Sequence, residues 1–331
     1  MDAAPLAHGG DLGAARLLFP GAREPFVDLS TGINPHAYPI PRLEPEAFRR
    51  LPEPAAVRRL SAVAAKAYGA PSAAHVVAAP GTQILLPYVA GLVPSGRAAV
   101  LATTYSEHVR VARLVGQVTT EVADVGQLHD ADLAIVVNPN NPDGRLFRKE
   151  TLLALADMLG LLIVDEAFMD VGPPGASLAG EVGRANVVVL RSFGKFFGLA
   201  GLRLGFALAA PDIAARLRAS LGPWAVSGPA IAVGEIALAD APWIAATRAR
   251  LETEAQQLDA LLVNAGLDLV GGTSLFRLVR SAAASELFHR LGRAGIFVRR
   301  FAERPDWLRF GLPRDETAWQ RLETALSVVN E

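Results

Sequence analysis

The 331-residue sequence contains no cysteine, which excludes disulfide bonds, thiolate metal sites and cysteine nucleophiles. It also has almost no net charge, because 32 Lys and Arg residues balance 33 Asp and Glu residues. This composition gives no indication of binding to nucleic acid or to an anionic membrane. Histidine is scarce, at six residues, and none pairs with another at metal-ligand spacing. We therefore expect no metal, no nucleic acid and no membrane among its partners.

Long apolar runs and nucleotide-binding fingerprints are missing as well. Residues 70–96 carry no Asp, Glu, Lys or Arg, but Pro80, Pro87 and Gly91 interrupt them, which favours a strand, a turn and a buried helix over a membrane span. There is no G-x-G-x-x-G, and Gly194-Lys195 is followed by Phe instead of Ser or Thr. The N-terminal residues lack a basic region followed by an apolar core, so we expect no signal peptide and a cytoplasmic protein.

What is present indicates an α/β fold. Hydrophobic residues make up 51% of the chain, enough to fill the core of one large domain and a smaller one. Strand and helix patterns alternate, which is typical of a parallel sheet. We expect helices over residues 44–67, 149–159, 211–220 and 243–265, and strands over 75–79, 98–102, 132–137, 161–164, 187–190 and 203–208. Residues 267–280, 295–300 and 307–311 predict further strands, with helices over 284–292 and at the C-terminus.

The chain is organised around S-F-G-K-F-F-G-L-A-G-L-R, residues 192–203, which follows the apolar run 187–190. Lys195 lies between phenylalanines and glycines, and partial desolvation there disfavours its charged form. It is a candidate amine nucleophile. Ser192 and Arg203 are a hydroxyl and a guanidinium that could close around one anion. Alone, S-x-x-K is more commonly a surface lysine beside a turn.

Further candidates follow two earlier strands. Gly81, Thr82 and Gln83 turn a strand into a helix, where free backbone N–H groups and the helix dipole suit a phosphate. The alternative is an ordinary strand-to-helix turn. Tyr105 offers a flat face for an aromatic cofactor, and core packing is the alternative.

Two polar residues end the central apolar runs. Asn141 lies in N-P-N-N-P-D-G, residues 138–144, a rigid turn that fixes a side-chain amide. Asp165 ends the run L-L-I-V-D, where a buried acid needs a cationic partner. A protonated pyridine nitrogen would supply that charge, and a neighbouring arginine is the alternative.

Three motifs occur in the order N-P-x-x-P-x-G, D-E-A-F and S-x-x-K. In this order they resemble the pyridoxal-phosphate (PLP) enzymes of the aspartate-aminotransferase superfamily. The resemblance implies pyridoxal 5'-phosphate as cofactor, a large domain with a mostly parallel seven-stranded sheet, and a smaller α+β domain. It makes Lys195 the Schiff-base lysine, pairs Asp165 with the pyridinium nitrogen, and places Asn141 on the ring O3′ and Tyr105 against the ring. It assigns the cofactor phosphate to Gly81, Thr82, Gln83, Ser192 and Arg203.

Two arginines fall in or at the end of C-terminal apolar strands. Guanidinium groups suit carboxylates and phosphates, although surface arginines extending from edge strands are the alternative. In the histidinol-phosphate aminotransferase branch, similar positions bind the two anions of the substrate. By that resemblance Arg309 takes the α-carboxylate and Arg299 the phosphate.

The N-terminal segments H-G-G-D-L, residues 8–12, and D-L-S-T-G-I-N-P, residues 28–35, by themselves predict only loops. They resemble the threonine-phosphate decarboxylases of cobalamin biosynthesis, which convert L-threonine O-3-phosphate to (R)-1-amino-2-propanol O-2-phosphate and CO2. The resemblance implies that His8 and Asn34 line the substrate pocket and that Gly32 lets the backbone approach the substrate. Otherwise His8 is a mobile terminal histidine.

Alternative functions differ in chemistry. A histidinol-phosphate or related class I/II aminotransferase is the first, but Phe168 stands where many carry Tyr, and Leu51-Pro52 where Tyr-Pro is frequent. A non-catalytic PLP-binding or nucleotide-binding protein would have little use for Lys195. We expect an N-terminal segment (1–40) packed on the small domain and active site, a large domain (41–235), a small domain (236–331), and a homodimer, because the family's active sites form at a subunit interface.

Overall fold

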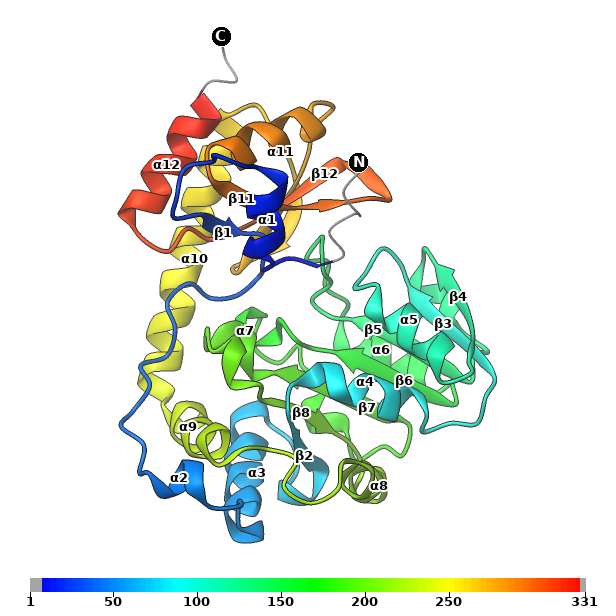
Figure 1. Cartoon of the computed structure of the whole chain (residues 1–331). Helices are drawn as coiled ribbons and strands as arrows, with labels where there is room; N and C mark the ends of the chain where they lie inside the picture. Colours follow the sequence, from blue (N-terminus) through cyan, green and yellow to red (C-terminus); the bar gives the residue numbers. More distant parts are fainter. Residues whose placement is uncertain (1–7, 328–331) are drawn as a thin grey trace. The chain divides into compact units, whose positions relative to one another are not determined.

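The computed structural model describes residues 8–327, which form two compact units (Figure 1). The large unit is Ala37–Ile244, and the small unit combines residues 8–36 with residues 245–327. Each unit is built around its own sheet.

The sheet of the large unit has seven strands in the order β2-β8-β7-β6-β5-β3-β4. Their bounds are β2 (Val76–Ala79), β3 (Arg97–Leu101), β4 (Val118–Val122), β5 (Leu133–Val137), β6 (Leu161–Asp165), β7 (Val187–Ser192) and β8 (Gly205–Leu208). Only β8 runs antiparallel to its neighbours, and every other pair is parallel. The predicted mostly parallel seven-stranded sheet is confirmed. β4 was not predicted, because this edge strand exposes most of its side chains and lacks an apolar run.

The helices of the large unit include α4, which packs against β7 and β8, and α6, which packs against β6. The predicted helix over 44–67 is wrong as one element: α2 ends at Arg49 and α3 begins at Pro54, because residues that precede a proline disfavour helical conformation. The α-helices are α2 (Glu46–Arg49), α3 (Pro54–Tyr68), α4 (Thr82–Ala90), α5 (Glu107–Leu114), α6 (Lys149–Ala156), α7 (Phe193–Phe196), α8 (Pro211–Leu221) and α9 (Gly228–Ala239). Short 3-10 helices are η1 (Ala73–His75), η2 (Val125–Leu128), η3 (Met169–Val171), η4 (Ala179–Glu181) and η5 (Ala200–Leu202).

The small unit has a five-stranded sheet in the order β1-β11-β12-β10-β9. Its strands are β1 (Val27–Leu29), β9 (Asp268–Thr273), β10 (Phe276–Arg280), β11 (Ile296–Phe301) and β12 (Arg304–Gly311), and its helices are α1 (Leu12–Leu18), α11 (Ala284–Arg293) and α12 (Glu316–Ser327). The single strand predicted over 267–280 is a hairpin of β9 and β10. The N-terminal segment, predicted as loop, contributes β1, which pairs in parallel with β11.

Helix α10 (Ala241–Asn264) begins in the sequence range of the large unit and continues into that of the small unit. Within residues 8–327, no single helix combines the length and the apolar character of a membrane span; α9 and α10 meet those criteria only when counted together across a break.

Candidate active site

The predicted cofactor residues follow strands that end at one edge of the large sheet. Strands β2, β7, β6, β5 and β3 run in the same direction, so their carboxyl ends lie along this edge, where ligands bind in open α/β sheets. β8 is antiparallel, so its first residue, Gly205, and the preceding Arg203 reach the same edge. The topology therefore brings together Gly81, Thr82, Gln83, Tyr105, Asn141, Asp165, Ser192, Lys195 and Arg203.

An anion cradle lies at the start of α4. Gly81 has a φ of +84°, and a Cβ atom there would come within 2.6 Å of Arg203 Nη2. A Cβ atom at Gly205 would come within 2.6 Å of the Thr82 backbone nitrogen. Arg203 itself is left-handed, with a φ of 53°. The two glycines allow a close approach: the start of β8 lies directly against the start of α4, and the Arg203 guanidinium lies against Gly81. The first N–H groups of α4 have no partner inside the helix, so they and Arg203 together could hold an anion.

The Gln83 side chain has two hydrogen-bond partners within the large unit. Its Nε2 donates to Glu107 Oε2 at 2.7 Å, and its Oε1 accepts from the Tyr105 hydroxyl at 3.1 Å. Glu107 in turn accepts two hydrogen bonds from Arg110. The side chain of Gln83 therefore holds Tyr105 in place, and its backbone N–H is one of the first N–H groups of α4, which have no partner inside the helix.

Asp165 is buried and held on both carboxylate oxygens. Oδ1 accepts from the Ala167 N–H at 3.0 Å, and Oδ2 lies 2.9 Å from His108 Nε2. An ionised Asp165 places the proton on His108 Nε2. From the sequence we considered an arginine as the partner of Asp165 and did not identify His108, whose side chain is buried at 2% exposure. The available signal was its spacing of three residues from Tyr105 at the start of α5, and the two rings meet edge to face at 5.9 Å.

The turns that carry Asn141 and Tyr105 are tied together by Asn140, another residue the sequence missed. Asn140 Oδ1 accepts from the Thr104 hydroxyl at 2.7 Å. Asn140 Nδ2 donates to the Thr103 carbonyl at 2.9 Å and to Asp143 at 2.8 Å. The amide of Asn140 thus links the turn that precedes Tyr105 to the turn that carries the half-buried Asn141.

Lys195 is half-buried in the short helix α7. Its Nζ lies 5.8 Å from the centre of the Phe168 ring, three residues after Asp165. The adjacent Phe196 and Phe197 are buried, and Phe197 stacks on Trp243 at 5.6 Å. The amine therefore lies near one aromatic ring, while the phenylalanines that follow it in the chain are buried and anchor α7.

The predicted substrate residues all belong to the small unit. Arg299 on β11 stands directly opposite Arg309 on β12. Arg309 is buried, and its Nη2 donates to the Ser30 carbonyl at 2.8 Å. Burial and the charge of Arg299 lower the pKa of Arg309 to about 9, against the opposing effect of Asp28. Like charges directly opposite each other on paired strands are destabilising, and an anion between them would relieve this repulsion.

The N-terminal residues lie beside these arginines. His8 and Arg299 line one small hollow together with Ser30 and Phe297. Ser30, which the sequence missed, accepts a hydrogen bond from the Gly10 N–H at 2.8 Å and donates to Asp28 Oδ1 at 2.6 Å. It therefore fastens the segment that carries His8.

Asn34 and Gly32 are both buried just beyond β1. The Asn34 side chain accepts from the His36 N–H at 2.8 Å, which fixes its amide within the turn.

Comparison with known proteins gives a consistent result. A model of the family "Aminotransferase class I and II" matches residues 43–324. A protein from Sinorhizobium sp named threonine-phosphate decarboxylase is 43% identical over 331 residues, covering 98% of each chain. A protein of the same name from Pseudomonas aeruginosa is 40% identical over 328 residues, covering 97% of each chain.

Two solved structures illustrate the fold. The L-threonine-O-3-phosphate decarboxylase from Porphyromonas gingivalis aligns with a TM-score of 0.75 at 20% identity, covering 91% of this chain and 98% of that chain. The histidinol-phosphate aminotransferase from Clostridium acetobutylicum aligns with a TM-score of 0.80 at 22% identity, covering 92% and 99%. These structures support the fold, while the family model and the full-length relatives show that this chain belongs to the class I and II aminotransferase family.

Proposed function

We propose that this protein is a PLP-dependent decarboxylase that converts L-threonine O-3-phosphate to (R)-1-amino-2-propanol O-2-phosphate and CO2, a step of cobalamin biosynthesis. The structural observation that carries the proposal is the pair Arg299 and Arg309, opposed across β11 and β12. Two adjacent guanidinium groups suit a substrate with two anionic groups, a carboxylate and a phosphate. Relatives of nearly full length that are named threonine-phosphate decarboxylase support this choice of substrate.

The residues at the edge of the large sheet fit pyridoxal phosphate. The start of α4, where Arg203 lies against Gly81 because no Cβ atom intervenes, suits its phosphate, with Arg203 and the N-terminal N–H groups of α4 as donors. Asp165 is a buried carboxylate suited to the ring nitrogen, Asn141 to the ring O3′, and Tyr105 to the ring face. When bound, the cofactor supplies a conjugated ring that accepts the electron pair left by a bond broken at the substrate Cα.

The side chains then have separate tasks. Asp165, held by His108 and the Ala167 N–H, would keep a proton on the ring nitrogen. Arg309 binds the substrate carboxylate, and Arg299 binds the substrate phosphate. Lys195 Nζ would supply the proton that replaces the carboxylate on Cα once CO2 has left. His8, Gly32 and Asn34 contribute to substrate binding from the small unit.

Decarboxylation and transamination differ in which bond at Cα stands perpendicular to the cofactor ring. Purified protein is incubated with L-threonine O-3-phosphate, and CO2, the phosphorylated amine and any keto acid are measured with and without 2-oxoglutarate. We expect equal amounts of CO2 and amine without any added keto acid. Turnover only in the presence of 2-oxoglutarate, with glutamate as product, would assign the histidinol-phosphate type of transamination instead.

A homodimer in the cytoplasm, without nucleic acid or membrane, completes the proposal. The segment that leads into α3 exposes three large apolar side chains, Ile40, Phe48 and Leu51, which are 63%, 68% and 64% exposed. Apolar side chains gathered in so short a segment favour burial against a second copy. Light scattering that gives the mass of two chains supports this, and a monomer at micromolar concentration contradicts it.

A further inference from the structure

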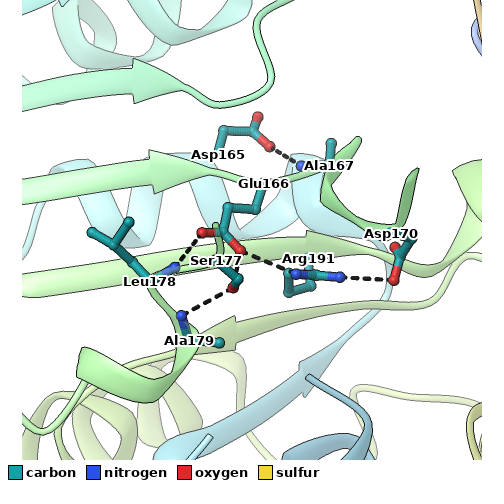
Figure 2. A network of polar contacts seen from close by, with 8 residues as sticks. All are labelled: Asp165, Glu166, Ala167, Asp170, Ser177, Leu178, Ala179 and Arg191. Carbon is teal, nitrogen blue, oxygen red and sulfur yellow. Dashed lines mark hydrogen bonds and ion pairs between the residues drawn. The ribbon is translucent and has the colours of Figure 1, made fainter. Parts of the chain in front are cut away.

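Three charged side chains are buried behind the candidate active site. Arg191 Nη1 donates to Glu166 Oε2 at 3.0 Å, and its Nη2 donates to Asp170 Oδ1 at 2.7 Å. Glu166 also accepts from the Ser177 hydroxyl at 2.5 Å and from the Leu178 N–H at 2.7 Å. Figure 2 shows that the Glu166 carboxylate points to the opposite side of the strand from the Asp165 carboxylate. We refer to Glu166, Asp170 and Arg191 as the rear charge cluster.

Filling a core with the rear charge cluster costs more free energy than filling it with apolar side chains. Burial of charges costs free energy, and apolar residues of similar volume usually stabilise a fold equally well. Burial lowers the pKa of Arg191, but Asp170 and Glu166 outweigh that effect and raise it, so the guanidinium stays charged. The Tyr68 ring covers it, with its centre 4.4 Å from Cζ. Fold stability alone therefore does not account for the cluster.

The position of the cluster along the chain indicates what it does. Successive side chains of a strand point to opposite faces. Glu166 and Arg191, which bond each other, therefore lie on the face of the sheet opposite to Asp165 and Ser192. The ion pair therefore fastens the end of β6 to the end of β7, beside the main-chain bond from the Glu166 N–H to the Leu190 carbonyl at 2.9 Å. Asp170 lies two residues beyond Phe168, whose ring faces Lys195 Nζ.

We propose that Arg191, through Glu166 and Asp170, is a positioning residue that sets Asp165 relative to Lys195. This inference rests on the proposed function, in which those two side chains hold the cofactor. An arginine is needed because one planar guanidinium spans both carboxylates, whereas a lysine ammonium is a single point charge.

The test follows the absorbance band of the bound cofactor as a function of pH, together with cofactor affinity. Arg191→Lys keeps the charge but cannot bridge both carboxylates. Ser177→Ala removes one donor from Glu166 and is the milder change. Arg184→Lys is the matched control, because Arg184 pairs at 2.6 Å with Asp157 through side chains that are 41% and 65% exposed. Leu128→Ala, at a fully buried position in the short helix η2, controls for lost stability.

We expect Arg191→Lys to weaken cofactor binding about 10-fold, equivalent to about 1.4 kcal/mol, and to move the pH midpoint of the band. We expect Ser177→Ala to move both in the same direction by less. Both controls should keep the wild-type midpoint, even where Leu128→Ala lowers Tm more than Ser177→Ala. If Arg191→Lys does not fold, the cofactor affinity and pH midpoint of Ser177→Ala test the positioning role instead.

Folded variants with the wild-type midpoint and affinity would overturn the positioning role while the wild-type band still supports the proposed function. Wild-type protein without a band would reject the proposed function itself.

Discussion

Substitution of Gly81 by alanine tests whether the anion cradle binds the cofactor, because its effect on cofactor affinity can be distinguished from the effect of backbone strain on stability. The new Cβ atom would lie 2.6 Å from Arg203 Nη2, so the guanidinium has to move. A hydrogen bond to a charged group contributes about 1.5–3 kcal/mol. Since 1.4 kcal/mol is a factor of ten in an equilibrium constant, we expect the dissociation constant of pyridoxal phosphate to rise about 10- to 100-fold. The strain itself is present with and without cofactor and so does not change the affinity.

Gly69→Ala is the matched control. Gly69 has a φ of +78° at the end of α3, but a Cβ atom there would meet nothing within 4 Å. A left-handed conformation costs an L-residue roughly 1–2 kcal/mol, so both variants should lose thermal stability. Cofactor affinity is measured by absorbance titration. Affinity of Gly81→Ala within twofold of the wild type would refute the cradle, as would an equal loss in Gly69→Ala.

Three further predictions concern the two units separately. His108→Phe keeps a ring but removes the hydrogen-bond donor to Asp165 Oδ2. A hydrogen bond to a charged group contributes about 1.5–3 kcal/mol, so we expect a steady-state assay to show kcat lowered about 10-fold. An unchanged kcat would show that His108 does not support Asp165 in this way. Bound anions favour the charged form of Arg309, and its pKa is lowered to about 9. Calorimetry should therefore show a sulfate affinity that is constant below pH 9 and falls above it. Arg299→Gln removes the charge that repels Arg309, so the sulfate affinity should begin to fall at a higher pH, although the affinity at pH 7 is lower. An unchanged pH midpoint of sulfate binding would show that Arg299 does not affect the pKa of Arg309. Gly9→Ala would place a Cβ atom 2.3 Å from the Ser30 carbonyl oxygen, so we expect a KM for L-threonine O-3-phosphate raised several-fold with unchanged cofactor affinity, and a wild-type KM would count against the N-terminal contact.

The local sequence pattern was enough to predict the central strands of the large sheet and the candidate residues at their ends. Each central strand of the large sheet is a fully buried apolar run, and the first polar residue after it marks the edge where a ligand binds. Asp165 and Lys195 became candidate site residues for this reason. The hairpin of β9 and β10 was read as one strand, because its turn at residues 274–275 carries neither Gly nor Pro.

Long-range partners were out of reach of the sequence. His108 meets Asp165 across 57 residues of chain, and Arg309 meets Ser30 across 279, so both contacts depend on how elements pack. The need for a partner to Asp165 could be stated from the chain, but the identity of that partner could not. The rear charge cluster is similar, since its members are separated in sequence and join only when β6 and β7 pair.

The most direct test of the account is the site of covalent attachment of the cofactor. The chain has only three lysines, Lys66, Lys149 and Lys195, so the result is easily assigned. Protein incubated with pyridoxal phosphate is reduced with borohydride, which makes a C=N bond to the amine permanent, and peptides are mapped by mass spectrometry. We predict stoichiometric modification of Lys195 and none of the exposed Lys66. An unmodified Lys195, or equal labelling of all three lysines, would contradict the account.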